Sequence, residues 1–91
     1  MAEISKFEEF QIYPCKFPLK AVGLNEDGFF ETVVDTVCRH IPGLDDTYFS
    51  SRLSSADKYI SVSVTFIAES REQVDKLYTD LSENKKILMI L

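Results

Sequence analysis

The stretch KYISVSVTFIA, residues Lys58–Ala68, alternates strongly between apolar and polar side chains. Successive side chains of a β-strand point to opposite faces, so a period of two predicts a strand with one packed face and one largely polar face. The packed face is expected to carry Ile60, Val62, Val64, Phe66 and Ala68. This is the clearest strand in the chain, and the segments on either side of it must supply the rest of a sheet and a layer that covers its apolar face.

A helix is predicted directly after this strand. Ser70 followed by Gln73 is a capping-box pattern, in which the serine hydroxyl accepts from the third amide of the helix and the glutamine reaches back. The apolar residues that follow at helical spacing are Val74, Leu77, Tyr78 and Leu81. The chain then closes with Lys86–Leu91, KILMIL, which is predicted as a strand that is apolar on both faces.

Working back from Lys58, the sequence predicts two further strands and one helix. Ser54–Asp57 turns the chain, and Tyr48–Leu53 is predicted as a short strand. Phe29–Ile41 has helical spacing and is stopped by Pro42-Gly43. Its apolar stripe is Phe30, Val33, Val34, Val37 and Ile41. Cys15–Val22 alternates again, with Phe17, Leu19 and Ala21 on one face.

The resulting order is β-α-β-β-α-β. With right-handed crossovers it predicts an α+β ferredoxin-like sandwich, in which a four-stranded antiparallel sheet has the first and third strands at its centre and two helices on one face. We expect residues 14–91 to form this single domain and residues 1–13 to form an N-terminal extension. Leu88 and Ile90 are expected to point away from the helices on an edge strand, and exposed apolar edges invite association. Either the N-terminal segment or a second copy of the chain is expected to cover them.

Composition excludes several classes of protein. The net charge of −5 and the pI of about 4.7 argue against nucleic-acid and anionic-membrane partners, which require a positive field. No apolar run approaches the ~20 residues of a transmembrane helix, and the N-terminus lacks a signal-peptide pattern, so a cytoplasmic location is expected. Cys15 and Cys38 form no CxxC pair and His40 is the single histidine, so neither a zinc site, a structural disulfide nor any other cofactor is expected.

The chain resembles the YbeD-like family of small bacterial proteins. The resemblance rests on ordered segments that cover nearly all of the chain from Tyr13 onward: YPCKFPLKAVG (Tyr13–Gly23), RHIPG (Arg39–Gly43), SSADKYISVSVT (Ser54–Thr65), EQVDKLY (Glu72–Tyr78) and a closing MIL (Met89–Leu91). It implies a ferredoxin-like fold similar to that of ACT domains, the amino-acid-sensing modules of metabolic enzymes. It implies no activity. The chain departs from the family where the hairpin turn, which often contains glycine, reads Ala56-Asp57-Lys58.

The loop Gly23–Gly28 is a candidate ligand site because it precedes a helix N-terminus, where anions often bind. Its candidate residues are Gly23, Asn25, Asp27 and Gly28. Glu26 and Asp27 would repel a phosphate there, so a small metabolite with a cationic group, such as an amino acid, is the ligand that this loop would tolerate. The preferred interpretation of the loop, however, is a helix N-cap with favourable acidic neighbours.

A second candidate is an interaction surface on the sheet. Lys20, Arg52, Tyr59, Ser61 and Ser63 are expected to converge on the uncovered face, and Leu88 and Ile90 are expected to extend this surface at the edge. RNA-recognition domains of this fold place aromatic residues at alternate positions of the third strand, whereas this chain has serines there. The surface is therefore interpreted as a solvated face or as a contact with another protein.

Cys15 and His40 are the remaining candidates for chemistry. Cys15 is expected to be exposed beside Lys16, which favours a thiolate, whereas Cys38 is expected to be a small core residue. His40 is expected to stabilise the C-terminal end of its helix. The leading hypothesis is a non-catalytic regulatory or interaction module that binds itself as a homodimer or binds a partner protein, with a small metabolite as a further ligand. The alternative is a small enzyme or redox-sensitive protein that uses Cys15 or His40.

Overall fold

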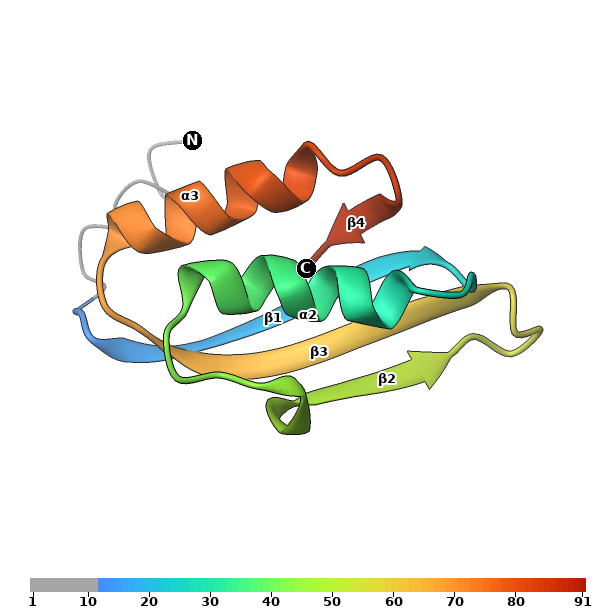
Figure 1. Ribbon diagram of the computed structural model, residues 1–91, viewed down its shortest axis with the longest axis horizontal. Coiled ribbons are helices and arrows are strands. Elements are labelled where there is room, and N and C mark those ends of the chain that lie inside the picture. Colours follow the sequence, from blue (N-terminus) through green and yellow to red (C-terminus); the bar gives the residue numbers. More distant parts are fainter. Residues whose placement is uncertain (1–11) are drawn as a thin grey trace.

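The computed structural model describes residues 12–91, and its elements follow the predicted order β-α-β-β-α-β. The strands form one antiparallel sheet in the order β2-β3-β1-β4, with both helices side by side on one side of it (Figure 1). This confirms the ferredoxin-like fold. The elements are β1 (Cys15–Leu24), α2 (Phe29–His40), the 3-10 turn η1 (Asp46–Tyr48), β2 (Phe49–Leu53), β3 (Tyr59–Ala68), α3 (Arg71–Ser82) and β4 (Ile87–Ile90).

The alternation in β1 and β3 places their apolar side chains on the helix side of the sheet. Leu19 lies opposite Val64 and Ala21 lies opposite Val62, and all four are buried. The helices supply the other half of the core through Val33, Val37, Leu77 and Leu81, none of which is exposed. In the predicted stripe of α2, Phe30 and Val34 are only partly buried, while Phe29, outside the stripe, is buried.

The end of β1 packs too closely for any side chain at Gly23. A Cβ atom there would lie 2.3 Å from the Phe29 ring and 2.5 Å from the backbone oxygen of Lys86. The pairing of β1 with β4 contains a bulge between Val22 and Gly23. Val22 pairs with Met89 and Gly23 pairs with Ile87, so Leu88 has no partner on β1. Glycine therefore allows the backbone that enters β4 to approach β1 closely, and the extra residue changes which side chains of β4 face outward.

The two helices are joined at one end by side chains as well as by the core. The Ser70 hydroxyl accepts from the Gln73 amide at 3.2 Å, which confirms the predicted cap of α3. The Gln73 side chain accepts from the Glu69 amide at 2.8 Å and donates to the backbone oxygen of His40 at 3.1 Å. One glutamine thus satisfies groups at the start of α3 and at the end of α2, where helices leave backbone groups unpaired.

The turn between β2 and β3 is closed by Asp57, which has the left-handed φ of 57°. Its amide donates to the backbone oxygen of Ser54 at 2.9 Å. Aspartate is one of the few residues besides glycine that enters this region readily, which explains how the chain makes the turn without a glycine. The Asn25 side chain donates to the Asp57 backbone oxygen at 3.0 Å and ties the β1–α2 loop to this turn.

Most of the N-terminal extension expected at residues 1–13 lies outside the described residues. The expectation that it covers β4 therefore stays a prediction. Of its last two residues, Ile12 is exposed and Tyr13 packs against the core. Within residues 12–91, neither helix is long and apolar enough to cross a membrane.

Candidate functional site

The side of the sheet opposite the helices has no layer over it among the described residues. We call this surface the open face. Paired residues of neighbouring strands share a face, so the register of β3 against β1 and β2 identifies its members. They are Lys16, Pro18, Lys20, Val22 and Leu24 of β1, Ser50 and Arg52 of β2, Tyr59, Ser61, Ser63, Thr65 and Ile67 of β3, and Met89 with Leu91 at β4.

The structure brings together the five sheet residues predicted from the sequence. Lys20 lies opposite Ser63, and Arg52 lies opposite Ser61. Tyr59 lies opposite Leu24 on the same face. Short serine side chains in the middle of β3 leave the long cationic side chains of β1 and β2 standing on either side of them. The sequence-based interpretation of these five positions as one surface is consistent with this geometry.

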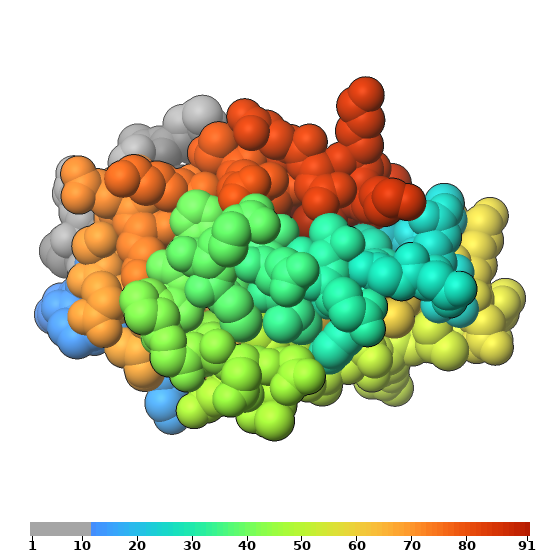
Figure 2. All heavy atoms as spheres, viewed as in Figure 1, coloured from blue at the N-terminus to red at the C-terminus, as the bar shows by residue number. Residues whose placement is uncertain are grey.

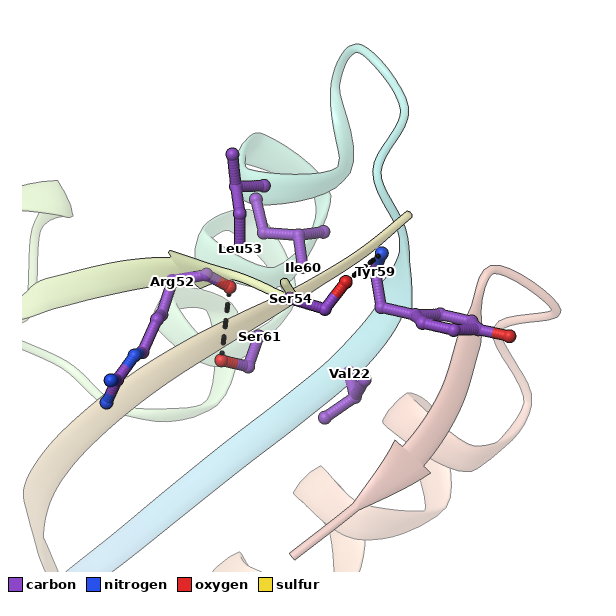
Figure 3. A pocket seen from close by; sticks show the side chains of 7 residues that line it. All are labelled: Val22, Arg52, Leu53, Ser54, Tyr59, Ile60 and Ser61. Carbon is purple, nitrogen blue, oxygen red and sulfur yellow. Dashed lines mark hydrogen bonds between the residues drawn. The ribbon is translucent and has the colours of Figure 1, made fainter. Parts of the chain in front are cut away.

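Two shallow depressions lie on either side of the serines. One, of about 270 Å³, is lined by Arg52, Ser61 and Val22 of β1, and Figure 3 shows these three side chains. The Ser61 hydroxyl donates to the backbone oxygen of Arg52 at 3.4 Å, and the Tyr59 amide donates to the Ser54 hydroxyl at 3.0 Å. The other depression, of about 300 Å³, contains Lys20, Ser63 and Leu91. Each depression therefore has one cation at its wall.

Apolar side chains gather on the β4 side of the open face. Val22 lies opposite Met89, and the backbones of Lys20 and Leu91 exchange hydrogen bonds of 3.1 and 2.8 Å. Met89 is 53% exposed and Leu91 is 63% exposed, which is high for large apolar side chains. Leu24 and Tyr59, which lie opposite each other on the same face, continue this group of apolar side chains next to Val22. We call Val22, Leu24, Tyr59, Met89 and Leu91 the apolar strip.

The structure corrects one member of the predicted edge. Ile90 lies opposite the buried Ala21 and packs against the core, so the expectation that it points away from the helices is wrong. The reason is the bulge at Leu88, which breaks the simple alternation assumed for Lys86–Leu91. Leu88 is 57% exposed, as expected, while Met89 takes the outward place that the sequence pattern assigned to Ile90.

In the loop Gly23–Gly28, the candidate ligand residues make contacts within the chain itself. Gly23 has no room for a side chain. The Asn25 amide donates to the Lys58 backbone oxygen at 2.9 Å, and Glu26 pairs with Lys86 at 3.0 Å. Gly28 is the N-cap of α2 with a φ of 87°, and no side chain caps this helix. The loop thus caps α2 through the backbone of Gly28 and not through an acidic side chain, and a ligand at Gly23, Asn25, Asp27 and Gly28 stays a prediction.

His40 has a partner that the sequence did not reveal. Its Nε2 lies 2.9 Å from the Asp80 carboxylate, which also accepts from Arg39 at 3.0 Å. These hydrogen bonds, from His40 first and Arg39 second, lower the pKa of Asp80. His40 and Asp80 line a groove of about 300 Å³ on the helix side, the side that Figure 2 faces. The arrangement links the ends of two helices that are forty residues apart in the chain.

Neither cysteine forms a disulfide. Cys15 is half-buried and packs against the core, so the expectation that it is exposed is wrong. It begins β1 on the inward side, opposite the buried Ala68. Cys38 also packs against the core, and burial, followed by nearby aspartates, raises the pKa of its thiol. Among residues 12–91, no group of three or more histidine, cysteine or acidic side chains is placed to hold a metal ion.

Similarity to other proteins agrees with the fold and with the resemblance drawn from the sequence. Residues 8–91 match the family described as "Protein of unknown function (DUF493)". A UPF0250 protein of Janthinobacterium sp. (strain Marseille) is 40% identical over 91 residues, which is the full length of both chains. A UPF0250 protein of Shewanella woodyi is 37% identical over 96% of this chain and 97% of its own.

A solved structure gives an independent view of the architecture. The solution structure of protein HP0495 from H. pylori superposes with a TM-score of 0.61 over 89% of this chain and 85% of that one. The sequences are 18% identical, so this likeness supports the fold alone.

Proposed function

The chain belongs to the DUF493 family of proteins of unknown function, and we propose that it is a non-catalytic module that binds another protein chain through its open face. The observation that carries this proposal is the apolar strip on a sheet surface that no other segment of residues 12–91 covers. Soluble monomers rarely expose contiguous apolar groups without using them, and such groups next to polar residues mark interaction sites.

The geometry of the strip suits a protein partner better than a small molecule. The two depressions beside it are shallow and open, whereas small-molecule sites are concave and enclose most of their ligand. The side chains of the apolar strip are arranged over β1, β3 and β4 instead of around a cavity. A flat apolar centre with a polar rim is the usual form of a protein interface.

Site-specific photocrosslinking in cells tests this proposal. A photoreactive benzoylphenylalanine would replace Met89 or Thr65 on the open face, and Glu72 or Lys76 on α3 would serve as matched controls, since all four side chains are exposed. We expect adducts from the two open-face positions and none from α3. An adduct of twice the chain's mass identifies a second copy, and any other mass identifies a different protein. Adducts from α3 alone, from both sides equally, or from no position would contradict the proposal.

His40 keeps a small enzyme as the second candidate, because a histidine hydrogen-bonded to a carboxylate is an arrangement that catalysis also uses. A purely structural role for this hydrogen bond is to link α2 to α3, with Asp80 shared between His40 and Arg39. A His40→Ala variant that is as stable as the wild type yet fails to replace it in a deletion strain would favour the enzyme. Full replacement by this variant would exclude a catalytic role for His40.

A further inference from the structure

The acidic character of the chain is not spread over its whole surface. Residues 12–91 contain twelve acidic and nine basic side chains. The four strands hold three of the basic side chains, Lys16, Lys20 and Arg52, and no aspartate or glutamate. The helices and connections therefore hold six basic and twelve acidic side chains, a net charge of −6, against +3 on the strands.

All three strand cations belong to the open face. Lys16 lies opposite Ile67, Lys20 opposite Ser63, and Arg52 opposite Ser61. Lys16 and Lys20 are four residues apart on β1, which separates their backbones by about 13 Å, while Arg52 is two strands away at about 10 Å from β1. Among residues 12–91, no ion pair joins any of the three to a carboxylate, whereas Arg39 and Lys86 on the helix side are paired. The open face is thus a cationic surface on an acidic protein.

From this we propose that the open face binds an acidic protein segment, whose carboxylates pair with Lys16, Lys20 and Arg52 while its apolar side chains pack on the apolar strip. This inference rests on the proposed function and names the chemistry of the partner. Complementary charge speeds encounter and suppresses wrong partners, and apolar anchors supply most of the affinity. The cations lie on β1 and β2 and the apolar strip lies beside them on β1, β3 and β4, so a partner must offer both acidic and apolar groups.

Other occupants fit this surface less well. Single-stranded RNA would need aromatic side chains in the middle of β3, where Ser61 and Ser63 lie, and the net charge of −6 on the helices and connections opposes its binding. A second copy that presents its own open face brings three like charges to three like charges. A second copy that presents its acidic helix side would fit by charge, but such a head-to-tail contact repeats without closing into a dimer. A different chain with acidic residues would be neither repelled by like charges nor forced into an open-ended head-to-tail assembly.

Two synthetic ten-residue peptides with the same alternate leucines test the inference, one with glutamate and one with lysine at the remaining positions. Binding would be followed by fluorescence anisotropy at low and high salt, and the site would be mapped by amide shifts in ¹H–¹⁵N spectra. We expect the glutamate peptide to bind more tightly, to weaken with salt, and to shift amides of β1, β2 and β3. If it binds no more tightly than the lysine peptide, or shifts amides of the helices, the inference is wrong.

Charge-reversal variants supply the matched control. The pair Lys20→Glu/Arg52→Glu changes the open face, and the pair Lys76→Glu/Arg71→Glu makes the same change of charge on α3. We expect the first pair to weaken binding of the glutamate peptide by about tenfold and the second to leave it unchanged. Both must unfold at temperatures close to that of the wild type. Equal weakening by the two pairs, or none by the first, would overturn the inference.

The same variants separate this inference from the proposed function. If the crosslinks at Met89 and Thr65 persist in Lys20→Glu/Arg52→Glu, the open face binds protein but not through its charge, and the inference alone fails. If these crosslinks do not form in the wild type, the proposed function fails as well. A ten-nucleotide single-stranded RNA that binds more tightly than the glutamate peptide and loses binding in the same variant would assign the face to nucleic acid and overturn the inference.

Discussion

Gly23→Ala is expected to destabilise the fold strongly, because one added methyl group has no space. Its Cβ would lie 2.3 Å from the Phe29 ring and 2.5 Å from the Lys86 backbone oxygen. Carbon atoms in contact are ordinarily about 3.5–4.0 Å apart. Phe29 is only 2% exposed, so its ring cannot turn into solvent, and the Lys86 oxygen can move only if the backbone before β4 moves.

The cost can be estimated from these contacts. Inserting a methyl group into a well-packed site costs about 1–3 kcal/mol, and we place this variant at the upper end, since one of the two atoms belongs to the backbone. For a domain of 60–100 residues each kcal/mol lowers the unfolding temperature by about 4–8 °C, so a loss of roughly 10–20 °C is expected. The assay is thermal and urea unfolding followed by circular dichroism.

Gly28→Ala is the matched control. Gly28, unlike Gly23, has a positive φ, 87°, and an added Cβ there meets nothing within 4 Å, so only backbone strain of about 1–2 kcal/mol is expected. Gly23→Ala should therefore lose more stability than Gly28→Ala, and amide shifts of β4 should change only in the former. If the two variants lose equal stability, the close approach of Lys86 to Gly23 does not set the position of β4, and the account of the bulge is wrong.

Two further predictions concern other parts of the fold. Asp80→Asn should lower the free energy of unfolding at pH 7, and urea unfolding should show that the difference from the wild type shrinks toward pH 3. The pKa of Asp80 is lower in the folded chain than its ordinary value of 3.8, so its contribution to stability is complete above 3.8 and is lost as the pH falls through the folded value. A difference that is constant with pH would refute this. Asp57→Gly should keep the free energy of unfolding within about 0.5 kcal/mol of the wild type, whereas Asp57→Val should lower it by about 1–2 kcal/mol. The reason is that a φ of 57° strains the backbone of a β-branched residue but not that of glycine. Equal losses in the two variants would show that the aspartate side chain, not the backbone conformation, matters.

Local patterns were sufficient to predict the elements and the packed face of each central strand. Alternation in residues 58–68 predicted which side chains of β3 enter the core, and Ser70 predicted the start of α3. The same register predicted that Lys20, Arg52, Ser61 and Ser63 lie on one face of the sheet. These signals are contained within one element, and each is decided by a single periodicity or cap.

What the sequence did not predict depends on contacts between distant segments. The pairing of His40 with Asp80 joins residues forty positions apart, and no periodicity marks it. The bulge at Leu88 depends on how closely Lys86 approaches Gly23, so the outward place of Met89 could not be read from the pattern of β4. The cationic open face was hidden by the overall charge of −5, because a total does not tell how the charges are divided between faces.

The contacts of the β1–α2 loop bear on whether partner binding needs a metabolite. A ligand that acts through this loop must move it, and Gly23 has no free space toward Phe29 or Lys86. Asn25 ties the loop to the β2–β3 turn, and Glu26 ties it to the segment before β4 at 3.0 Å. A ligand can shift an equilibrium only if two arrangements differ in their contacts with it, and these tethers favour one arrangement of the loop. The open face is already exposed in that arrangement, so, among the described residues, the proposed binding of an acidic segment requires no prior change at the loop.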